Sequence, residues 1–303
     1  MSFDRLQEKI DRLQNPTVVG LDPAFDLIPP HLIQKYIQEK GETLDAVAEA
    51  ILEFSIGIIN ALFDIVPAIK PQSAFYEALG PVGVGVLKLV INFAKDKGMY
   101  VILDAKRNDI GSTAEAYSTA YLGAIKIGDK LFFPFDADAL TVNAYLGTDG
   151  VKPFINNAKV YDKALFALVK TSNPSSGELQ DKIIDGKPLY AIVGELMESI
   201  SKDTIGAYGY SRVGAVVGAT YPDELRYLRN NLKNTFFLVP GYGAQGGSAV
   251  AVASAFDDKG RGVVINSSRG IISAWKNTSD LYTVAARNEA LKMRDQLRKV
   301  CYN

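Results

Sequence analysis

The sequence has very little of the side chains that build metal and thiol sites. Its 303 residues include one cysteine, one histidine and one tryptophan. Cys301 lies two residues from the C-terminus, so an internal disulfide and a thiolate metal cage are excluded. With His31 as the single histidine, a histidine-rich metal site is excluded and a Ser-His-Asp triad is disfavoured. Any chemistry must therefore depend on lysine, arginine, carboxylates and backbone groups.

The chain also lacks an excess of charge of either sign. Its 33 basic and 34 acidic residues give a formal net charge of −1, with no polybasic stretch. Nucleic-acid tracks and membrane-surface sites both need clustered positive charge, so neither is expected. Charges interrupt both the N-terminus and the most apolar helical window, residues 46–65, so neither a signal peptide nor a membrane span is predicted. We expect a soluble, cytoplasmic protein.

Eight short apolar runs recur along the chain, with helical patterns between them. The apolar fraction of 48% is enough for a sizeable core. Strict alternation of strands and helices indicates parallel pairing, because helices must cover the outer face of the sheet. Eight units favour an α/β fold of the closed (β/α)₈ type, a TIM barrel, over an open doubly wound sheet. The expected strands are residues 17–22, 65–70, 100–106, 139–144, 164–170, 213–219, 235–241 and 262–266.

No linker-like run divides the chain, so residues 1–303 are predicted to form a single domain, with an N-terminal helix at about residues 2–14. Two long loops are expected, at residues 23–64 and 174–210. Loops that follow barrel strands lie at the catalytic face, so long ones there are candidate lids. The 174–210 loop is the stronger candidate because it follows a turn-rich stretch, whereas 23–64 is better interpreted as decoration of the barrel.

Two signals predict where helices begin. Ser112 and Glu115 have the spacing of a capping box, which would start a helix over residues 112–126. Pro222 suits the first turn of a helix over residues 222–232.

Charged side chains cluster where the first three expected strands end. Asp22 ends the first strand, Lys70 the second, and Asp104 and Lys106 the third, with Asp109 in the loop that follows. Asp104 and Lys106 are two residues apart, so on a strand they face the same way. Carboxylates on both sides favour the ammonium form of Lys106, which suits a proton donor or anion stabiliser better than an amine nucleophile. The alternative is a structural ion-pair network at the barrel rim.

A second candidate site follows the seventh expected strand. Residues 240–247 read PGYGAQGG and precede a helix expected at about Ser248. Glycines let backbone N–H groups approach an anion, and a helix N-terminus adds a partial positive charge. Arg269, after the eighth strand, offers a guanidinium to the same place, and barrels frequently bind phosphate with these two loops. The pattern predicts a phosphate site; glycine-rich turns beside a rim arginine are the alternative.

A third group, residues 170–174 (KTSNP), follows the fifth expected strand. Its hydroxyl and backbone groups could hydrogen-bond a polar planar ligand, or they could form an ordinary turn.

Together these segments resemble the orotidine 5′-phosphate decarboxylase family. The likeness rests on LDAKRNDIGST at 103–113, GLDP at 20–23, IKP at 69–71, VPGYGAQGG at 239–247 and SRG at 268–270. The length and long loops are similar to the larger, type-2 bacterial branch. The resemblance implies a carboxy-lyase that converts orotidine 5′-monophosphate (OMP) to uridine 5′-monophosphate (UMP) and CO₂. This is the last step of de novo pyrimidine (UMP) biosynthesis, and the resemblance implies no metal and no other cofactor.

The resemblance also implies roles for the matching residues. Lys106 would deliver a proton to C6 of the pyrimidine as CO₂ leaves, and Asp104 would lie against the departing carboxylate. Lys70, Asp22, Asp109 and Thr113 would hold the ribose. Asp109 and Thr113 would reach into the neighbouring subunit's site of a homodimer. The expected catalytic group is therefore Lys106, Asp104, Asp109 and Lys70.

The remaining matches concern the two ends of the nucleotide. Ser172 would meet the pyrimidine, although Thr171 could take that role. Gln245, Tyr242 and Arg269 would hold the phosphate, and Pro240 is also expected to bind substrate.

Two other functions are weighed against this one. A magnesium-dependent decarboxylase resembling the keto-gulonate phosphate enzymes would need a glutamate on the second strand, where this sequence has Lys70. A phospho-ligand sensor without catalysis would need the phosphate loops but not the array of Asp104, Lys106 and Asp109. The residues present favour OMP as the substrate.

Overall fold

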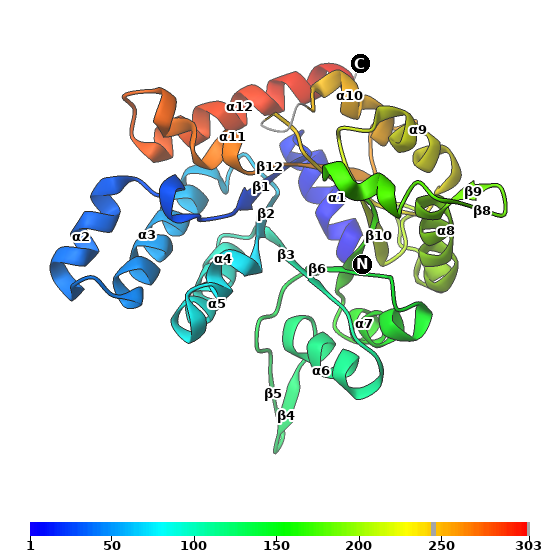
Figure 1. The fold of residues 1–303 in the computed structure, drawn as a ribbon, viewed down its shortest axis with the longest axis horizontal. Coiled ribbons are helices and arrows are strands. Elements are labelled where there is room, and N and C mark those ends of the chain that lie inside the picture. The colour runs from blue at the N-terminus through cyan, green and yellow to red at the C-terminus, as the bar shows by residue number, and fades with distance from the viewer. Residues whose placement is uncertain (244–246, 302–303) are drawn as a thin grey trace.

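Eight parallel strands close into a barrel in the computed structural model, which describes residues 1–243 and 247–301 (Figure 1). Each strand pairs in parallel with its neighbours, so the predicted TIM barrel is confirmed. In barrel order the strands are β1 (Thr17–Leu21), β2 (Ala68–Pro71), β3 (Tyr100–Arg107), β6 (Ala139–Val142), β7 (Ala164–Lys170), β10 (Val213–Val217), β11 (Phe237–Pro240) and β12 (Val263–Ser267).

All eight expected runs contain a strand, but β2 begins three residues later than expected. Ile65 and Val66 both donate their backbone N–H to the carbonyl oxygen of Leu62, so they form the turn that ends the preceding helix. An apolar run alone does not distinguish a helix end from a strand start.

An N-terminal helix, α1 (Ser2–Leu13), closes the end of the barrel where the strands begin. Its residues Phe3, Leu6 and Ile10 are buried in one cluster with inward-facing strand residues. The ring of Phe3 stacks on that of Phe236, with 4.9 Å between the centroids. The amino-terminal end of the barrel is therefore filled with apolar side chains, which leaves the carboxyl-terminal end for a site.

Helices surround the barrel on its outside (Figure 1). The long ones are α3 (Leu44–Leu62), α5 (Gly80–Asp96), α6 (Gly111–Tyr121), α7 (Thr148–Val160), α8 (Leu189–Ser201), α9 (Pro222–Asn231) and α12 (Tyr282–Cys301). The shorter ones are α4 (Ser73–Glu77), α10 (Ala249–Val252) and α11 (Arg269–Ile272). None of the helices in the described part of the chain combines the length and the hydropathy that a membrane span requires.

The two segments expected to be long loops contain regular structure. Residues 23–64 hold an additional helix, α2 (Pro30–Lys40), packed on α3, so most of this connection is helical. Residues 174–210 hold α8 and a two-stranded hairpin of β8 (Ile183–Ile184) and β9 (Lys187–Pro188). The irregular part after β7 is therefore shorter than expected.

One predicted helix start is confirmed and the other is wrong. Pro222 is the first residue of α9. The capping box is absent: α6 begins at Gly111, and its N-cap residue is Ile110, whose apolar side chain makes no capping hydrogen bond. The glycine has a φ of 52°, so the chain turns sharply into the helix before Ser112.

The helix expected over residues 112–126 ends at Tyr121, and a hairpin follows it. Its strands are β4 (Ile125–Ile127) and β5 (Lys130–Phe132), and it projects from the body of the molecule (Figure 1). Gly128 at the turn has a φ of 59°, a conformation that glycine adopts without strain. Gly128 and Asp129, two turn-forming residues between short apolar runs, were the sequence signal that would have predicted this hairpin.

Candidate active site

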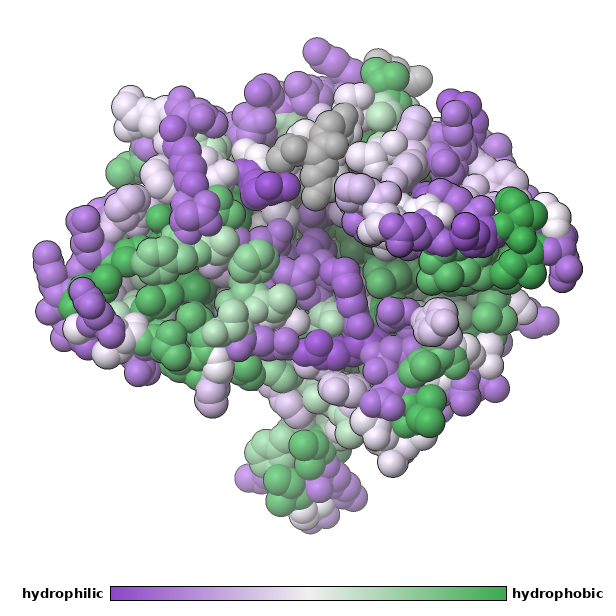
Figure 2. All heavy atoms as spheres, in the orientation of Figure 1, coloured by the Kyte–Doolittle hydropathy of each residue, from purple (hydrophilic) through white to green (hydrophobic). Residues whose placement is uncertain are grey.

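A cavity of about 470 Å³ lies at the carboxyl-terminal end of the barrel strands. Hydrophilic side chains gather at the centre of this face of the molecule (Figure 2). The predicted site residues in the cavity lining are Asp22, Lys70, Asp104, Lys106, Ser172, Pro240, Tyr242 and Arg269. They come from six of the barrel's strand ends, so closure of the barrel brings together residues that are up to 247 positions apart.

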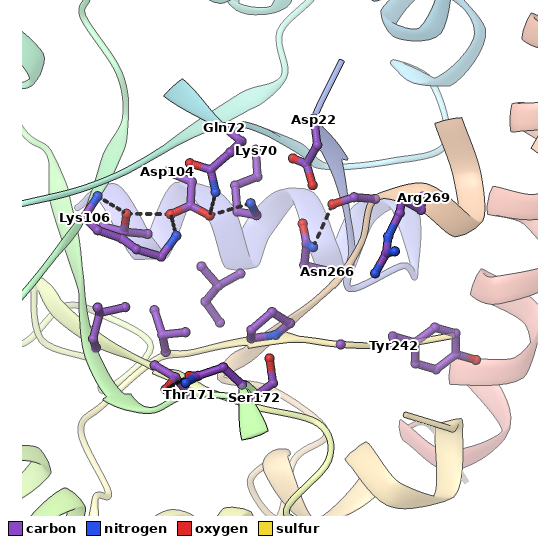
Figure 3. Close-up of a pocket in the computed structure, with 18 of the residues that line it drawn as sticks. Asp22, Lys70, Gln72, Asp104, Lys106, Thr171, Ser172, Tyr242, Asn266 and Arg269 are labelled. Carbon is purple, nitrogen blue, oxygen red and sulfur yellow. Dashed lines mark hydrogen bonds and ion pairs between the residues drawn. The ribbon is translucent and has the colours of Figure 1, made fainter. Parts of the chain in front are cut away.

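The carboxylate of Asp104 is the centre of a hydrogen-bond cluster (Figure 3). Its Oδ1 accepts from Lys106 Nζ at 2.6 Å and from the hydroxyl of Thr141 at 2.8 Å. Its Oδ2 accepts from Lys70 Nζ at 2.6 Å and from Gln72 Nε2 at 3.0 Å. Both oxygens are thus saturated, and this fixes the carboxylate between two ammonium groups.

Burial and charge act in opposite directions on this cluster. Burial alone would raise the pKa of Asp104, but Lys70 and Lys106 outweigh it and hold that pKa well below its usual range. Burial would lower the pKa of Lys70, yet Asp104 and Asp22 raise it above its ordinary value. The Lys70–Asp104 pair is therefore charged at neutral pH. Lys106 differs in exposure: 45% of its side chain is accessible, so its ammonium faces the cavity.

The backbone at Lys106 departs from the expected strand geometry. Lys106 has a φ of 50°, and the pairing of β3 with β6 shifts register between Leu103 and Arg107. The hydroxyl of Thr141 accepts from the backbone N–H of both Ala105 and Lys106, at 3.0 and 2.9 Å. Lys106 and Asp104 do meet, but a bulge held by Thr141 brings them together rather than simple strand alternation.

Asp109 and Thr113 do not line this cavity. Asp109 Oδ1 accepts from the backbone N–H of Ile110, and Thr113 is exposed in the first turn of α6. Within its own chain Lys106 thus pairs with Asp104 and not with Asp109, and the expected contribution of Asp109 to a neighbouring subunit's site stays a prediction. The bulge turns the ammonium toward Asp104 alone.

The opposite end of the cavity carries the predicted phosphate residues. Arg269, the first residue of α11, is exposed and lies across the cavity from Lys106 (Figure 3). Gly241 and Gly243 have φ values of 99° and 73°, a backbone conformation that residues other than glycine rarely adopt. The helix expected at about Ser248 is confirmed as α10, whose N-cap is Ser248. Gln245 lies outside the described residues.

Tyr242 lines the cavity, but its hydroxyl is bonded elsewhere. That hydroxyl donates to Gln296 Oε1 on α12 at 2.7 Å. The residue is 9% exposed and belongs to the apolar core. In this arrangement the backbone of Tyr242, rather than its hydroxyl, is the part available to a ligand.

The residues after β7 form another wall of the cavity, with Thr171, Ser172, Asn173 and Gln180. The hydroxyl of Thr171 donates to Asn173 Oδ1 at 2.6 Å and accepts from Gln180 Nε2 at 2.7 Å. Thr171 is therefore engaged in holding the segment itself.

Sequence reasoning missed Gln72 and Thr141, although both hold Asp104. Each was visible as a polar residue beside or within an apolar strand. Two residues of the cavity lining, Asp22 and Asn266, each have a buried Oδ1 that accepts no hydrogen bond from the described residues. Buried polar atoms are usually satisfied, so these two are suited to hydroxyl or amide donors of a ligand.

Across residues 1–243 and 247–301, no group of three or more His, Cys, Asp or Glu side chains is arranged to hold a metal ion.

Comparison with known proteins assigns the family. The sequence profile described as "Orotidine 5'-phosphate decarboxylase / HUMPS family" matches residues 44–281. This chain belongs to that family. A curated orotidine 5′-phosphate decarboxylase of Rhodopirellula baltica is 45% identical, with 97% of this chain and 98% of the relative covered. The corresponding protein of Caldicellulosiruptor bescii is 41% identical over 90% of both chains.

Solved structures of this decarboxylase family agree with the barrel. The OMP decarboxylase of Leishmania donovani superposes with a TM-score of 0.76 at 30% identity, with 100% of this chain and 99% of that chain covered. Leishmania donovani UMP synthase gives the same TM-score at 33% identity, with 98% of this chain and 56% of that chain covered. The predicted family and fold are confirmed, whereas the roles of individual residues stay predictions.

Proposed function

We propose a division of labour among the cavity residues for the decarboxylation of OMP to UMP by this chain. The C6–carboxylate bond breaks, CO₂ leaves, and the electron pair stays on C6. Lys106 then gives one ammonium proton to C6, which completes UMP, and the neutral amine regains a proton from water. Apart from the water that reprotonates the amine, these steps use only groups of the chain and the substrate.

The cluster around Asp104 is the observation that supports this proposal. The electron pair left at C6 has no conjugated acceptor, so a fixed positive charge must stabilise it as it develops. Lys106 supplies that charge and is fixed by Asp104, which Lys70 holds in turn. Asp104 would also lie against the departing carboxylate and so disfavour the bound substrate relative to the transition state.

The rest of the cavity fits the other parts of the nucleotide. Arg269 and the backbone of residues 240–243 would hold the phosphate, while Asp22 and Lys70 would hold the ribose hydroxyls. Ser172 would meet the pyrimidine, because the hydroxyl of Thr171 is already engaged. Phosphate binding at a distance from C6 can then contribute to catalysis by positioning the reacting end.

Turnover of OMP tests the function directly. We expect the protein to convert OMP to UMP, followed by the change in ultraviolet absorbance, with and without a chelator. Orotidine, which lacks the phosphate, should react with a kcat/KM at least about a hundredfold lower. No turnover of OMP would refute the function, and activity that a chelator removes and magnesium restores would favour the magnesium-dependent alternative.

A cytoplasmic homodimer with shared sites is also part of the proposal. Asp109 and Thr113 lie outside the cavity of their own chain, beside the exposed apolar side chains of Ile110 and Tyr117. The projecting β4–β5 hairpin adds exposed Ile125, Ile127 and Phe132. Ile125 is paired with Phe132, and Ile127 lies on the same face. Such an apolar surface is typical of a protein–protein contact, here with a second copy.

Mixed subunits test this sharing. Lys106→Ala and Asp109→Ala should each be inactive alone, but a hybrid contains one site in which both residues are native. Random mixing should therefore restore up to about a quarter of wild-type activity, since half of the dimers are hybrids with one intact site each. Native mass spectrometry should verify that hybrids form. Hybrids without activity would contradict shared sites.

A further inference from the structure

Lys170 is a fully buried lysine next to the cavity, and the proposed chemistry does not use it. It is the last residue of β7, and its side chain is 0% exposed. Burial of an ammonium group is costly unless it is paired. A buried Lys170 therefore needs partners that compensate its charge, and those partners indicate its role.

A shift of strand register turns Lys170 out of the cavity. Leu168 is paired with Val216, whereas Lys170 is paired with Val217, so Val169 is an extra residue on β7. Leu168 and Val216 line the cavity, but Val217 belongs to the core outside the barrel. Side chains alternate along a strand, so without the bulge Lys170 would share the inward face of Leu168.

The ammonium group of Lys170 is held from several sides. Its Nζ lies 2.5 Å from Asp181 Oδ1 and 3.4 Å from the hydroxyl of Ser176. It also lies 4.4 Å from the ring centre of Tyr221 and 5.7 Å from that of Tyr190, positions in which aromatic faces attract a cation. Both oxygen partners come from the chain that follows β7, so Lys170 ties that chain to the barrel.

The adjacent residues form a second tie of the same kind. The backbone N–H of Thr171 donates to Gln180 Oε1 at 2.9 Å, and Gln180 Nε2 donates to the hydroxyl of Thr171 at 2.7 Å. Residues 170 and 171 are thus joined side by side to residues 181 and 180. Thr171 and Gln180 both line the cavity, and Ser172 and Asn173 lie between them in sequence.

We infer that Lys170, through its ion pair with Asp181, is a positioning residue for the part of the cavity that receives the pyrimidine. It fixes the segment 171–181, so that Ser172 and Gln180 are presented to the base. This inference rests on the proposed function, in which the base lies against that segment. Lys170 itself touches no reacting atom.

Replacement of the carboxylate tests the inference without disturbing the core. Asp181 is half-exposed, so Asp181→Asn keeps the size of the side chain and removes only its charge. Asp185→Asn is the matched control, because Asp185 is an exposed aspartate just beyond this segment, at the turn between β8 and β9. For each protein we would measure kcat/KM for OMP and the inhibition constants of UMP and of ribose 5-phosphate, which lacks the base.

We expect Asp181→Asn to weaken UMP binding roughly tenfold, as for loss of one charge-assisted hydrogen bond, and to leave ribose 5-phosphate unaffected. Lys170→Met should show the same selectivity, and Asp185→Asn should behave as wild type. Equal weakening of both ligands would indicate a general structural role and overturn the inference, and so would unchanged UMP binding. Absence of OMP turnover in the wild type would instead refute the proposed function, so the two failures are distinguishable.

Discussion

Lys106→Ala should reduce kcat for OMP by at least about a thousandfold, because it removes the positive charge that stabilises the negative charge developing on C6. The fold should survive, since the Lys106 side chain is half-exposed and Asp104 keeps Lys70, Gln72 and Thr141 as partners. Binding of UMP should persist, because the phosphate end of the cavity is unchanged. Single-turnover kinetics and calorimetry with UMP measure the two effects separately.

The control for this variant is Lys233→Ala, which removes an exposed lysine from the turn between α9 and β11, outside the cavity lining. It should turn over OMP at the wild-type rate. If Lys106→Ala also retained a near-normal kcat, the ammonium group would have no part in the chemical step, and the proposed mechanism would fail.

Asp104→Asn should cost about 3 kcal/mol in the free energy of unfolding and abolish turnover as well. The substitution leaves the buried ammonium of Lys70 without its carboxylate, and loss of one partner from a buried ion pair is strongly destabilising. The NH₂ group of the new asparagine would also face hydrogen-bond donors, such as Lys70 Nζ and Gln72 Nε2, whose bonds the carboxylate now accepts. Urea unfolding at pH 7 measures the loss, with Asp258→Asn, an exposed position in the turn before β12, as the control.

The same pair predicts a pH dependence. The folded-state pKa of Asp104 is depressed, so its contribution to stability is complete above the unfolded-state pKa of about 3.8 and is lost as the pH falls toward the folded-state pKa. The stability difference between wild type and Asp104→Asn should therefore be constant from pH 7 to 5 and shrink below about pH 3.8. A difference that stayed constant down to pH 2.5 would show that the Asp104 carboxylate is not the source of the stabilisation.

The sequence predicted those features that depend on local pattern. Apolar runs located all eight strands, and the helix starts expected at Pro222 and at about Ser248 coincide with α9 and α10, because a proline and a capping serine are local signals. The charged residues at strand ends were located for the same reason: a charge that ends an apolar run is conspicuous, and parallel strands bring such ends together.

The features that sequence reasoning missed depend on pairing between distant segments. The bulges at Lys106 and Val169 arise where β3 and β7 meet their neighbours in the barrel, and nothing in the local sequence shows this register. Thr141 looks like an ordinary strand residue until β6 lies beside β3 and its hydroxyl meets Asp104. The turn at Gly128 is different, because its signal was present and was overlooked in favour of a longer helix.

Closure of the amino-terminal end of the barrel by α1 limits the routes by which substrate and products can move. Within residues 1–243 and 247–301, Phe3, Leu6 and Ile10 fill the amino-terminal end of the barrel, so the cavity opens to solvent at the opposite face. Entry of OMP, release of CO₂ and release of UMP must then all occur through this opening. CO₂ has to leave past the nucleotide that is still bound between it and solvent, and the next OMP molecule cannot bind until UMP has dissociated.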